Sequence, residues 1–559
     1  MTAPPHPLSR RPLLAVLASR SMRHPSRAAL VRDVVRSLAQ TVGVALLAAP
    51  LAVLWGIGHA ESNDYLGPHQ ASFASNYRGE VEVDLGPLGN AYLPSPRAPL
   101  GLKITVGGVV AAGGGDQSFF SERTLTAYAG IFAEPDEAVA GVVERLVDDV
   151  VRESLLAELA LLGAFAVVVG RRRLLAERLV RSVSARRAAV AYLTGLAVLS
   201  GVTLATPRAP LVTRIPVSLA AENRFHGLTV DSALLADGLD RGIKGVTLLT
   251  QRQQRAVRSY ISSADADLRQ QAVALPTPRS GESLMLGFSD LHCNQAMTEL
   301  VRRLVLLTRP TQVLSSGDDT VNGTAAERFC VTREARIAVD RPVVVATGNH
   351  DTDVTEAQMR NAEMVVLDGQ VVDSGGLTIL GDDDPERNLP FSVERVTDRP
   401  ETEQQLGQRL VDTAVGKDVD ALLVHQPAAA EVIMATPDPP ARLVLWGHFH
   451  SEDGPRVVTH SDGSWTVGMQ QGTAGGVRQP TFTSFSTPFS PPLIRADVYF
   501  YFRDDATGLV TGVQPVHFQP DATVDIAPRV DTGNVSELPF ETRVRLSGSE
   551  PAPSATPRR

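Results

Sequence analysis

Residues 284–292 read LMLGFSDLH, and this stretch decides the fold because a short apolar run ends directly in two residues that can bind a metal, Asp290 and His292. An apolar run followed at once by polar residues returns in TQVLSSGDD (311–319), RPVVVATGNHD (341–351), DALLVHQP (420–427) and ARLVLWGHFH (441–450). Runs of about four to eight β-branched and aliphatic residues are typical of buried strands. The sequence therefore predicts five strands, each with polar side chains just beyond its carboxyl end.

Helical stretches separate some of these strands. Residues 295–308 (QAMTELVRRLVLLT) have amphipathic spacing, and a second such stretch lies around 402–415. Strands that alternate with helices indicate an α/β fold, in which ligands bind beyond the carboxyl ends of the strands. We therefore expect five loops from one edge of a sheet to converge on one site.

The polar residues at these five places form a set suited to metal ions. Seven of them offer nitrogen or oxygen ligands: Asp290, His292, Asp318, Asn349, His425, His448 and His450. Neutral imidazoles and carboxylates suit Mn, Fe, Zn or Co, and no thiolate set accompanies them. Seven ligands are more than one ion needs, and with one shared carboxylate they divide into four around each of two ions. Two ions about 3.5–4 Å apart can clamp a phosphoryl group and ionise a bridging water near neutral pH.

The five blocks resemble, in content and order, the signature of the calcineurin-like metallophosphoesterase superfamily, which is D-x-H, G-D, G-N-H-D/E, H and G-H-x-H. The resemblance implies an α/β fold, a metallophosphoesterase β-sandwich flanked by helices, for a catalytic domain placed at 281–525. It also implies a hydrolase that cleaves a phosphoester by attack of a hydroxide bridging two divalent or mixed-valence metal ions.

Each matched residue receives a role from this resemblance. The first ion would be held by Asp290, His292 and His450, the second by Asn349, His425 and His448, and Asp318 would bridge them. His350 would bind no metal and would stabilise the phosphoryl oxygens or protonate the leaving group. Asp351 would orient His350.

Differences between this sequence and the motifs of individual subfamilies narrow the class of substrate. Thr347 stands where phosphoprotein phosphatases carry an Arg, Val321 where purple acid phosphatases carry a Tyr ligand, and Thr352 where nucleotidases carry a Phe. The block at 425–427 resembles the H-x-P of the phosphodiesterase-like branch, so a diester is favoured over a monoester. The alternative function is a catalytically weak or inactive scaffold or sensor at the membrane, although such relatives usually lose ligands.

Three apolar runs precede the catalytic domain, at 37–58, 154–170 and 188–205. The first is free of charge over 22 residues, and the second carries only Glu158. A helix needs roughly 20 apolar residues to cross a bilayer, with about 17 as the minimum. We therefore expect three transmembrane helices, with buried helices of a soluble domain as the alternative for the shorter two.

Arginine distribution sets the expected orientation. Residues 1–36 and 171–187 each hold seven Arg and one acidic residue, whereas 59–153 holds fourteen acidic and six basic residues. Short basic loops stay in the cytoplasm, so a multi-pass protein of the cell membrane is expected, with the catalytic domain outside. The first run is too long for a cleaved signal peptide and indicates a signal anchor.

The expected organisation follows from these runs. In order it comprises a basic cytoplasmic N-terminus (1–36), a helix (37–58), a β-rich extracytoplasmic segment with a helix (59–153), a helix (154–170), a basic cytoplasmic loop (171–187), a helix (188–205), an extracytoplasmic linker or module (206–280), the catalytic domain (281–525) and a disordered tail (531–559). Residues 206–280 are expected to pack with 59–135.

The remaining signals are weaker. Cys293 and Cys330 form either a disulfide in an oxidising compartment or two buried free thiols. The acidic run 382–384 indicates a solvated turn rather than a third metal site. A net charge of −9 does not indicate a basic surface that would bind nucleic acid. The expected partners are a phosphoester substrate and, through three helices, a lipid bilayer; the oligomeric state is not indicated.

Overall fold

The computed structural model describes residues 27–67, 69–95, 97–109, 135–175, 214–217, 227–390, 395–478 and 490–533. These residues divide into two compact units, one drawn from Met1–His59 and Val150–Thr203 and the other from Ala60–Asp149 and Leu204–Arg559. The second unit contains the five motif blocks.

The first unit is helical. It holds α1 (Arg27–His59) and the later part of α3 (Pro135–Leu175). A Cβ added at Gly56 of α1 would collide with Ser154 of α3, so small residues allow the two backbones to approach closely. Within the described residues one stretch, Thr41–His59, is long and apolar enough to cross a membrane.

The three predicted crossings therefore differ in their outcome. The first, 37–58, overlaps Thr41–His59. The second, 154–170, lies inside α3, where the described residues contain no candidate span. The third, 188–205, and most of the tail from 531 onward lie outside the described residues.

A seven-stranded sheet begins the second unit, and we call it with the first part of α3 the small β module. Its strands are β1 (Glu61–Leu66), β2 (His69–Asn76), β3 (Glu80–Asp84), β4 (Asn90–Pro94), β5 (Gly101–Val109), β6 (Ile215–Pro216) and β7 (Thr229–Val230), in the order β1-β2-β5-β3-β4-β7-β6. Segments before and after the 150–203 region thus share one sheet, as expected from the sequence.

Two larger sheets form the phosphoesterase part. The first contains β8 (Glu282–Phe288), β9 (Gln312–Ser315), β10 (Val343–Val345), β11 (Val365–Val366), β20 (Ala496–Asp504), β21 (Val510–Phe518), β22 (Val524–Ile526) and β23 (Val530–Asp531). The second contains β12 (Val372–Ser374), β13 (Leu377–Gly381), β16 (Val419–Leu423), β17 (Ala441–Trp446), β18 (Asp453–Thr459) and β19 (Trp465–Gln470). A separate hairpin pairs β14 (Glu386–Asn388) with β15 (Arg395–Thr397).

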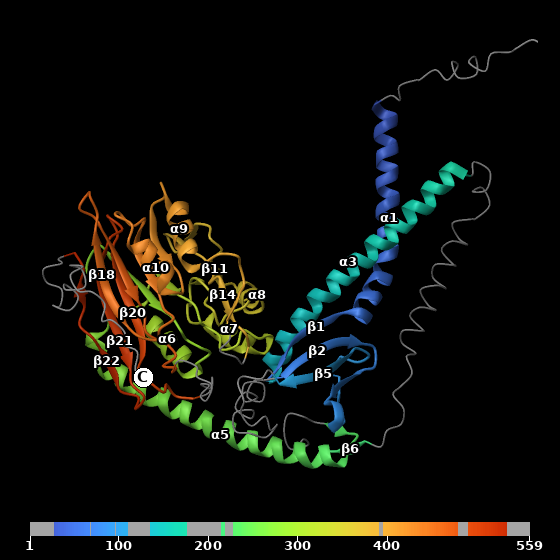
Figure 1. Cartoon of the computed structure of the whole chain (residues 1–559), viewed down its shortest axis with the longest axis horizontal. Helices are drawn as coiled ribbons and strands as arrows, with labels where there is room; N and C mark the ends of the chain where they lie inside the picture. Colours follow the sequence, from blue (N-terminus) through green and yellow to red (C-terminus); the bar gives the residue numbers. More distant parts are fainter. Residues whose placement is uncertain are drawn as a thin grey trace, which may run out of the picture. The chain divides into compact units, whose positions relative to one another are not determined.

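Helices cover the outer faces of the two sheets (Figure 1). They are α5 (Ala233–Gln270), α6 (Gln295–Thr308), α7 (Arg328–Glu334), α8 (Asp353–Asn361), α9 (Glu403–Ala414) and α10 (Pro427–Met434). One buried cluster joins the first sheet to α5 and α6, a second fills the space between the sheets, and a third joins the second sheet to α9 and α10. The predicted β-sandwich flanked by helices is thus present, but the five strands belong to two sheets and not to one.

The small β module packs against the sandwich at residues 325–328. Asp64 of β1 accepts a hydrogen bond from the Ala325 backbone N–H (3.1 Å), and Phe73 and Val142 pack with Ala325. Arg328 pairs with Glu144 at 3.3 Å. The module therefore contacts the loop that follows Asp318.

Candidate metal centre

The two sheets deliver the seven predicted ligands from their strand ends. The first sheet supplies those after β8, β9 and β10, and the second supplies those after β16 and β17; in chain order they are Asp290, His292, Asp318, Asn349, His425, His448 and His450. Parallel pairing of β8 with β9, of β9 with β10 and of β16 with β17 places these loops at matching ends. Their side chains are buried or half-buried.

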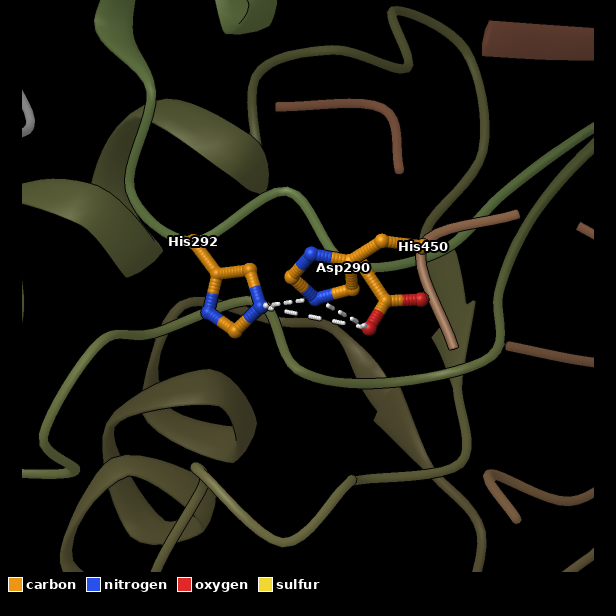
Figure 2. Close-up of side chains that lie close together, drawn as sticks. All are labelled: Asp290, His292 and His450. Atoms are coloured by element: carbon orange, nitrogen blue, oxygen red, sulfur yellow. Dashed lines mark hydrogen bonds and ion pairs between the residues drawn. The ribbon is translucent and has the colours of Figure 1, made fainter. Parts of the chain in front are cut away.

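A first cluster consists of Asp290, His292 and His450 (Figure 2). The Nε2 atoms of the two imidazoles lie 3.0 Å apart. Asp290 Oδ1 lies 3.2 Å from His450 Nε2 and 3.9 Å from His292 Nε2. Three ligand atoms thus surround one point.

A second cluster consists of Asp318, His425 and His448, with Asn349 beside it. Asp318 Oδ2 lies 3.2 Å from His425 Nε2, and His448 Nδ1 lies 3.2 Å from that same nitrogen. Asn349 Oδ1 is 3.0 Å from His448 Nδ1. Asp318 Oδ2 is also 3.8 Å from His292 Nε2, so this carboxylate lies between the two clusters.

Hydrogen bonds on the far side of each ring fix which nitrogen faces inward. Nδ1 of His292 meets the Thr320 carbonyl at 3.1 Å, and Nδ1 of His450 meets the Val477 carbonyl at 2.7 Å. A carbonyl only accepts, so each Nδ1 carries a proton and Nε2 is the atom turned toward the cluster. The two Nε2 atoms lie 3.0 Å apart, and the buried Asp290 Oδ1 beside them has no hydrogen-bond partner among the described residues, so the residues fit a metal ion.

The pKa values of the histidines also favour a metal ion at this site. Burial lowers the pKa of His292 to about 3 and that of His448 to about 4, so both rings are neutral at pH 7, which is the form that binds metals. Burial opposes a rise at His425, yet the carboxylate of Asp318 raises the pKa of His425 well above its usual range. The Asp318 carboxylate therefore favours a cation at this place.

The backbone at the ligands is unusual. Asp290, His292, Asp318, His448 and His450 all have φ between 44° and 76°, in the left-handed region. Such conformations cost about 1–3 kcal/mol each in non-glycine residues and persist where the surrounding structure requires them. Their concentration at five of seven predicted ligands indicates a functional site.

Two glycines make room for the carboxylates. A Cβ at Gly348 would overlap Asp318 Oδ1, and a Cβ at Gly447 would overlap Asp290 Oδ2. Neither glycine has a positive φ, so the requirement is space and not a special turn. Gly317, which precedes Asp318, is the glycine beside the ligands that has a left-handed backbone, with φ 92°.

His350 lies beside the clusters. Its ring is 4.9 Å from that of His292, its Nδ1 meets the Val321 carbonyl at 2.7 Å, and its backbone N–H donates to Asp318 Oδ1 at 2.8 Å. Asp351 is fully buried, and its carboxylate accepts hydrogen bonds from the backbone N–H groups of Gly348 (3.0 Å) and Thr320 (2.9 Å). Among the described hydrogen bonds none joins Asp351 to the His350 ring.

Other residues near the centre were not identified from the sequence. Asn388 Nδ2 lies 2.7 Å from His350 Nε2, and Arg395 Nη2 lies 3.1 Å from His448 Nε2. Both belong to the β14–β15 hairpin, and no motif in the sequence marks them. Asp382 and Asp384 are buried rather than solvated, and Asp382 pairs with Arg409 at 2.6 Å.

The two cysteines form a disulfide, which settles the alternatives left by the sequence. Cys293 and Cys330 are bonded, and both are buried against Phe329. Since Cys293 follows His292 directly, the bond ties the loop that carries this predicted ligand to α7.

Comparison with known proteins agrees with these motifs. The family described as calcineurin-like phosphoesterase matches residues 285–452. No curated protein matches the chain. Solved structures resemble part of the chain. A phosphatase of Mycoplasma pneumoniae has 12% identity over 44% of this chain and 95% of its own, with a TM-score of 0.30, and a protein of Thermus thermophilus has 13% identity over 43% of this chain and 99% of its own, with a TM-score of 0.28. A metallophosphoesterase from Sphaerobacter thermophilus has 15% identity over 48% of this chain and 98% of its own, with a TM-score of 0.22.

At these TM-scores the structural likenesses carry no weight, and the assignment rests on the sequence match and the motifs within it. The family uses divalent metal ions, and the His and Asp clusters of this chain are of the kind that holds them. Residues 285–452 of this chain are therefore a calcineurin-like phosphoesterase domain.

Proposed function

We propose that this chain is a membrane-anchored phosphoesterase that uses two metal ions to hydrolyse a phosphoester, with a diester as the favoured substrate. The observation that carries the proposal is the pair of His and Asp clusters with Asp318 between them, 3.2 Å from His425 and 3.8 Å from His292. A carboxylate in this position can serve both clusters at once.

Each ligand has a place in this proposal. Asp290, His292 and His450 hold one ion, Asn349, His425 and His448 hold the other, and Asp318 is shared. When bound, two divalent ions neutralise phosphoryl oxygens and lower the pKa of a water molecule that acts as the nucleophile. The donor set of imidazoles and carboxylates suits Mn, Fe, Zn or Co.

His350 acts on the substrate and not on the metals. Its Nδ1 proton is held by the Val321 carbonyl at 2.7 Å, which fixes the ring with Nε2 toward the site. At that nitrogen it can accept or supply a proton near the leaving group, or hydrogen-bond a phosphoryl oxygen. Asp351 serves as a positioning residue through the backbone of residues 319 and 320.

The membrane setting is supported by three features. Thr41–His59 is long and apolar enough to span, the arginines cluster at 1–36 and 171–187, and the Cys293–Cys330 disulfide suits an oxidising compartment. Together they favour an N-terminus in the cytoplasm and an extracytoplasmic phosphoesterase domain. We retain the domain boundaries expected from the sequence, with 281–525 as the catalytic domain.

Hydrolysis of bis-para-nitrophenyl phosphate tests the enzymatic proposal. The full chain is purified in detergent and assayed with added Mn²⁺, Fe²⁺, Zn²⁺ or Co²⁺, and Asp318→Asn is compared with wild type. We expect metal-dependent release of nitrophenol that Asp318→Asn lowers at least about 100-fold, because removal of a group that serves both ions costs several kcal/mol of transition-state stabilisation. Absence of turnover with every metal would favour the inactive scaffold or sensor.

A further inference from the structure

The β14–β15 hairpin brings two polar side chains to the metal centre. Asn388 and Arg395 are direct cross-strand partners in this hairpin. Asn388 Nδ2 lies 2.7 Å from His350 Nε2, and Arg395 Nη2 lies 3.1 Å from His448 Nε2. A single pair of residues therefore contacts both the proposed acid–base histidine and the second cluster.

A buried arginine anchors this hairpin. The Arg387 side chain is 7% exposed and donates to the Gly348 carbonyl (3.0 Å), to Glu356 Oε1 (2.9 Å) and to Asp383 Oδ2 (3.0 Å). Breaking a buried charged network of this kind is costly. The backbone of β14 is thus held directly against the G-N-H block.

Arg395, in contrast, is held weakly. Its side chain is 43% exposed, and its ion pair with Glu386 spans 3.2 Å between two similarly exposed groups. Exposed pairs contribute about 0–1 kcal/mol. Because this ion pair contributes so little free energy, the guanidinium of Arg395 can leave Glu386 and bind an anion instead. Its planar group of N–H donors matches two oxygens of a phosphate.

The ring of His448 lies between Arg395 and the second cluster. Nδ1 of His448 faces Asn349 Oδ1 and His425 Nε2, whereas Nε2 on the opposite side of the ring faces Arg395. The guanidinium therefore lies at the rim of the second cluster, and its 43% exposed side chain can turn to an anion that enters from solvent.

We propose that Arg395 binds a non-bridging oxygen of the substrate's phosphoryl group and is the phosphate-recognition residue of this site. This inference rests on the proposed phosphoesterase function. It adds that recognition of the anion comes from the hairpin and not only from the metals. Asn388, on the facing strand, lies 2.7 Å from Nε2 of His350, so the same hairpin also contacts the proposed acid–base histidine.

Orthophosphate is the probe for this proposal. The Mn²⁺-loaded full chain in detergent is titrated with orthophosphate by calorimetry, for wild type, Arg395→Gln and Arg302→Gln. Arg302 is the matched control because its side chain on α6 is 39% exposed and pairs with Glu299 at 3.8 Å, away from the ligand loops. We expect Arg395→Gln to raise the Kd for orthophosphate about 10-fold, as loss of a charge-assisted hydrogen bond predicts, and Arg302→Gln to bind as wild type.

Mn²⁺ affinity, measured separately on each variant, is expected to be unchanged. Equal orthophosphate affinity in wild type and Arg395→Gln would overturn the assignment of Arg395 and leave the phosphoesterase function intact. Weaker Mn²⁺ binding in Arg395→Gln would also overturn it, since Arg395 would then support the ligands. If the Mn²⁺-loaded wild type neither binds orthophosphate nor hydrolyses the diester, the proposed function fails, and this assignment fails with it.

Discussion

Removal of the Cys293–Cys330 disulfide is predicted to destabilise the phosphoesterase domain by about 4 kcal/mol. The bond closes a loop with a sequence separation of 37 residues. In the chain-entropy description, such a loop removes about 13 cal/mol/K from the unfolded state, which is about 4 kcal/mol at 25 °C. The variant Cys293→Ser/Cys330→Ser restores this entropy and leaves the flanking hydrogen bonds of the loop in place.

Urea unfolding followed by tryptophan fluorescence measures the effect. Trp446 and Trp465 lie in the sandwich, and Trp55 of α1 is replaced by Phe in every sample to silence it. We expect a lower unfolding midpoint in the double variant, and a reducing agent should lower wild type to the same midpoint without affecting the variant. A loss below about 1 kcal/mol at equal m-value would refute the reasoning, because the cross-link would then not limit the unfolded chain.

Three further predictions concern single side chains. Gly447→Ala should keep the fold but lower the Mn²⁺ stoichiometry measured by equilibrium dialysis, because the added Cβ overlaps a carboxylate oxygen of Asp290; full stoichiometry would contradict this. Asp64→Ala should cost about 1–3 kcal/mol in urea unfolding, because it leaves a buried backbone N–H of the sandwich unpaired, whereas Asp64→Asn keeps an acceptor oxygen and should cost less. Hydrogen bonds from Arg529 lower the pKa of Glu282 to about 2, so the stability that Glu282 contributes is present above about pH 4.5 and is lost as the pH falls toward 2. The difference in unfolding free energy between wild type and Glu282→Gln should shrink over this range, and a constant difference would exclude the linkage.

The sequence was sufficient to predict which polar side chains come together at the candidate site. Each predicted ligand follows a short apolar run. The length of such a run and its β-branched and aliphatic residues identify it as a buried strand. The structure brings all seven predicted ligands to one place, and the predicted sandwich flanked by helices is present. These features are predictable because they depend on local pattern and on motif order.

The arrangement of the sheets was not predictable in the same way. His425 follows a strand whose apolar residues resemble those before Asp290, yet the two strands lie in different sheets. A run of apolar residues shows that a strand is buried on both faces, but it does not show which strands pair with it. The left-handed backbone at Asp318 is likewise invisible in sequence, because aspartate occurs in many conformations.

Arg395 and the acidic run 382–384 show a second limit. Long-range pairing decides whether a charged residue is solvated, and Asp382 becomes buried because Arg409, distant in sequence, reaches it. Arg395 reaches His448 only through the register of a short hairpin. Neither contact leaves a periodic signal.

The seven-stranded sheet of the small β module also restricts how the chain can thread a bilayer. β5 ends at Val109 and β6 begins at Ile215, yet both belong to that sheet, and a hydrogen-bonded sheet of this kind lies on one side of a membrane. The chain between them must therefore cross an even number of times or not at all. The paired crossings expected at 154–170 and 188–205 satisfy this parity together, whereas either one alone would violate it.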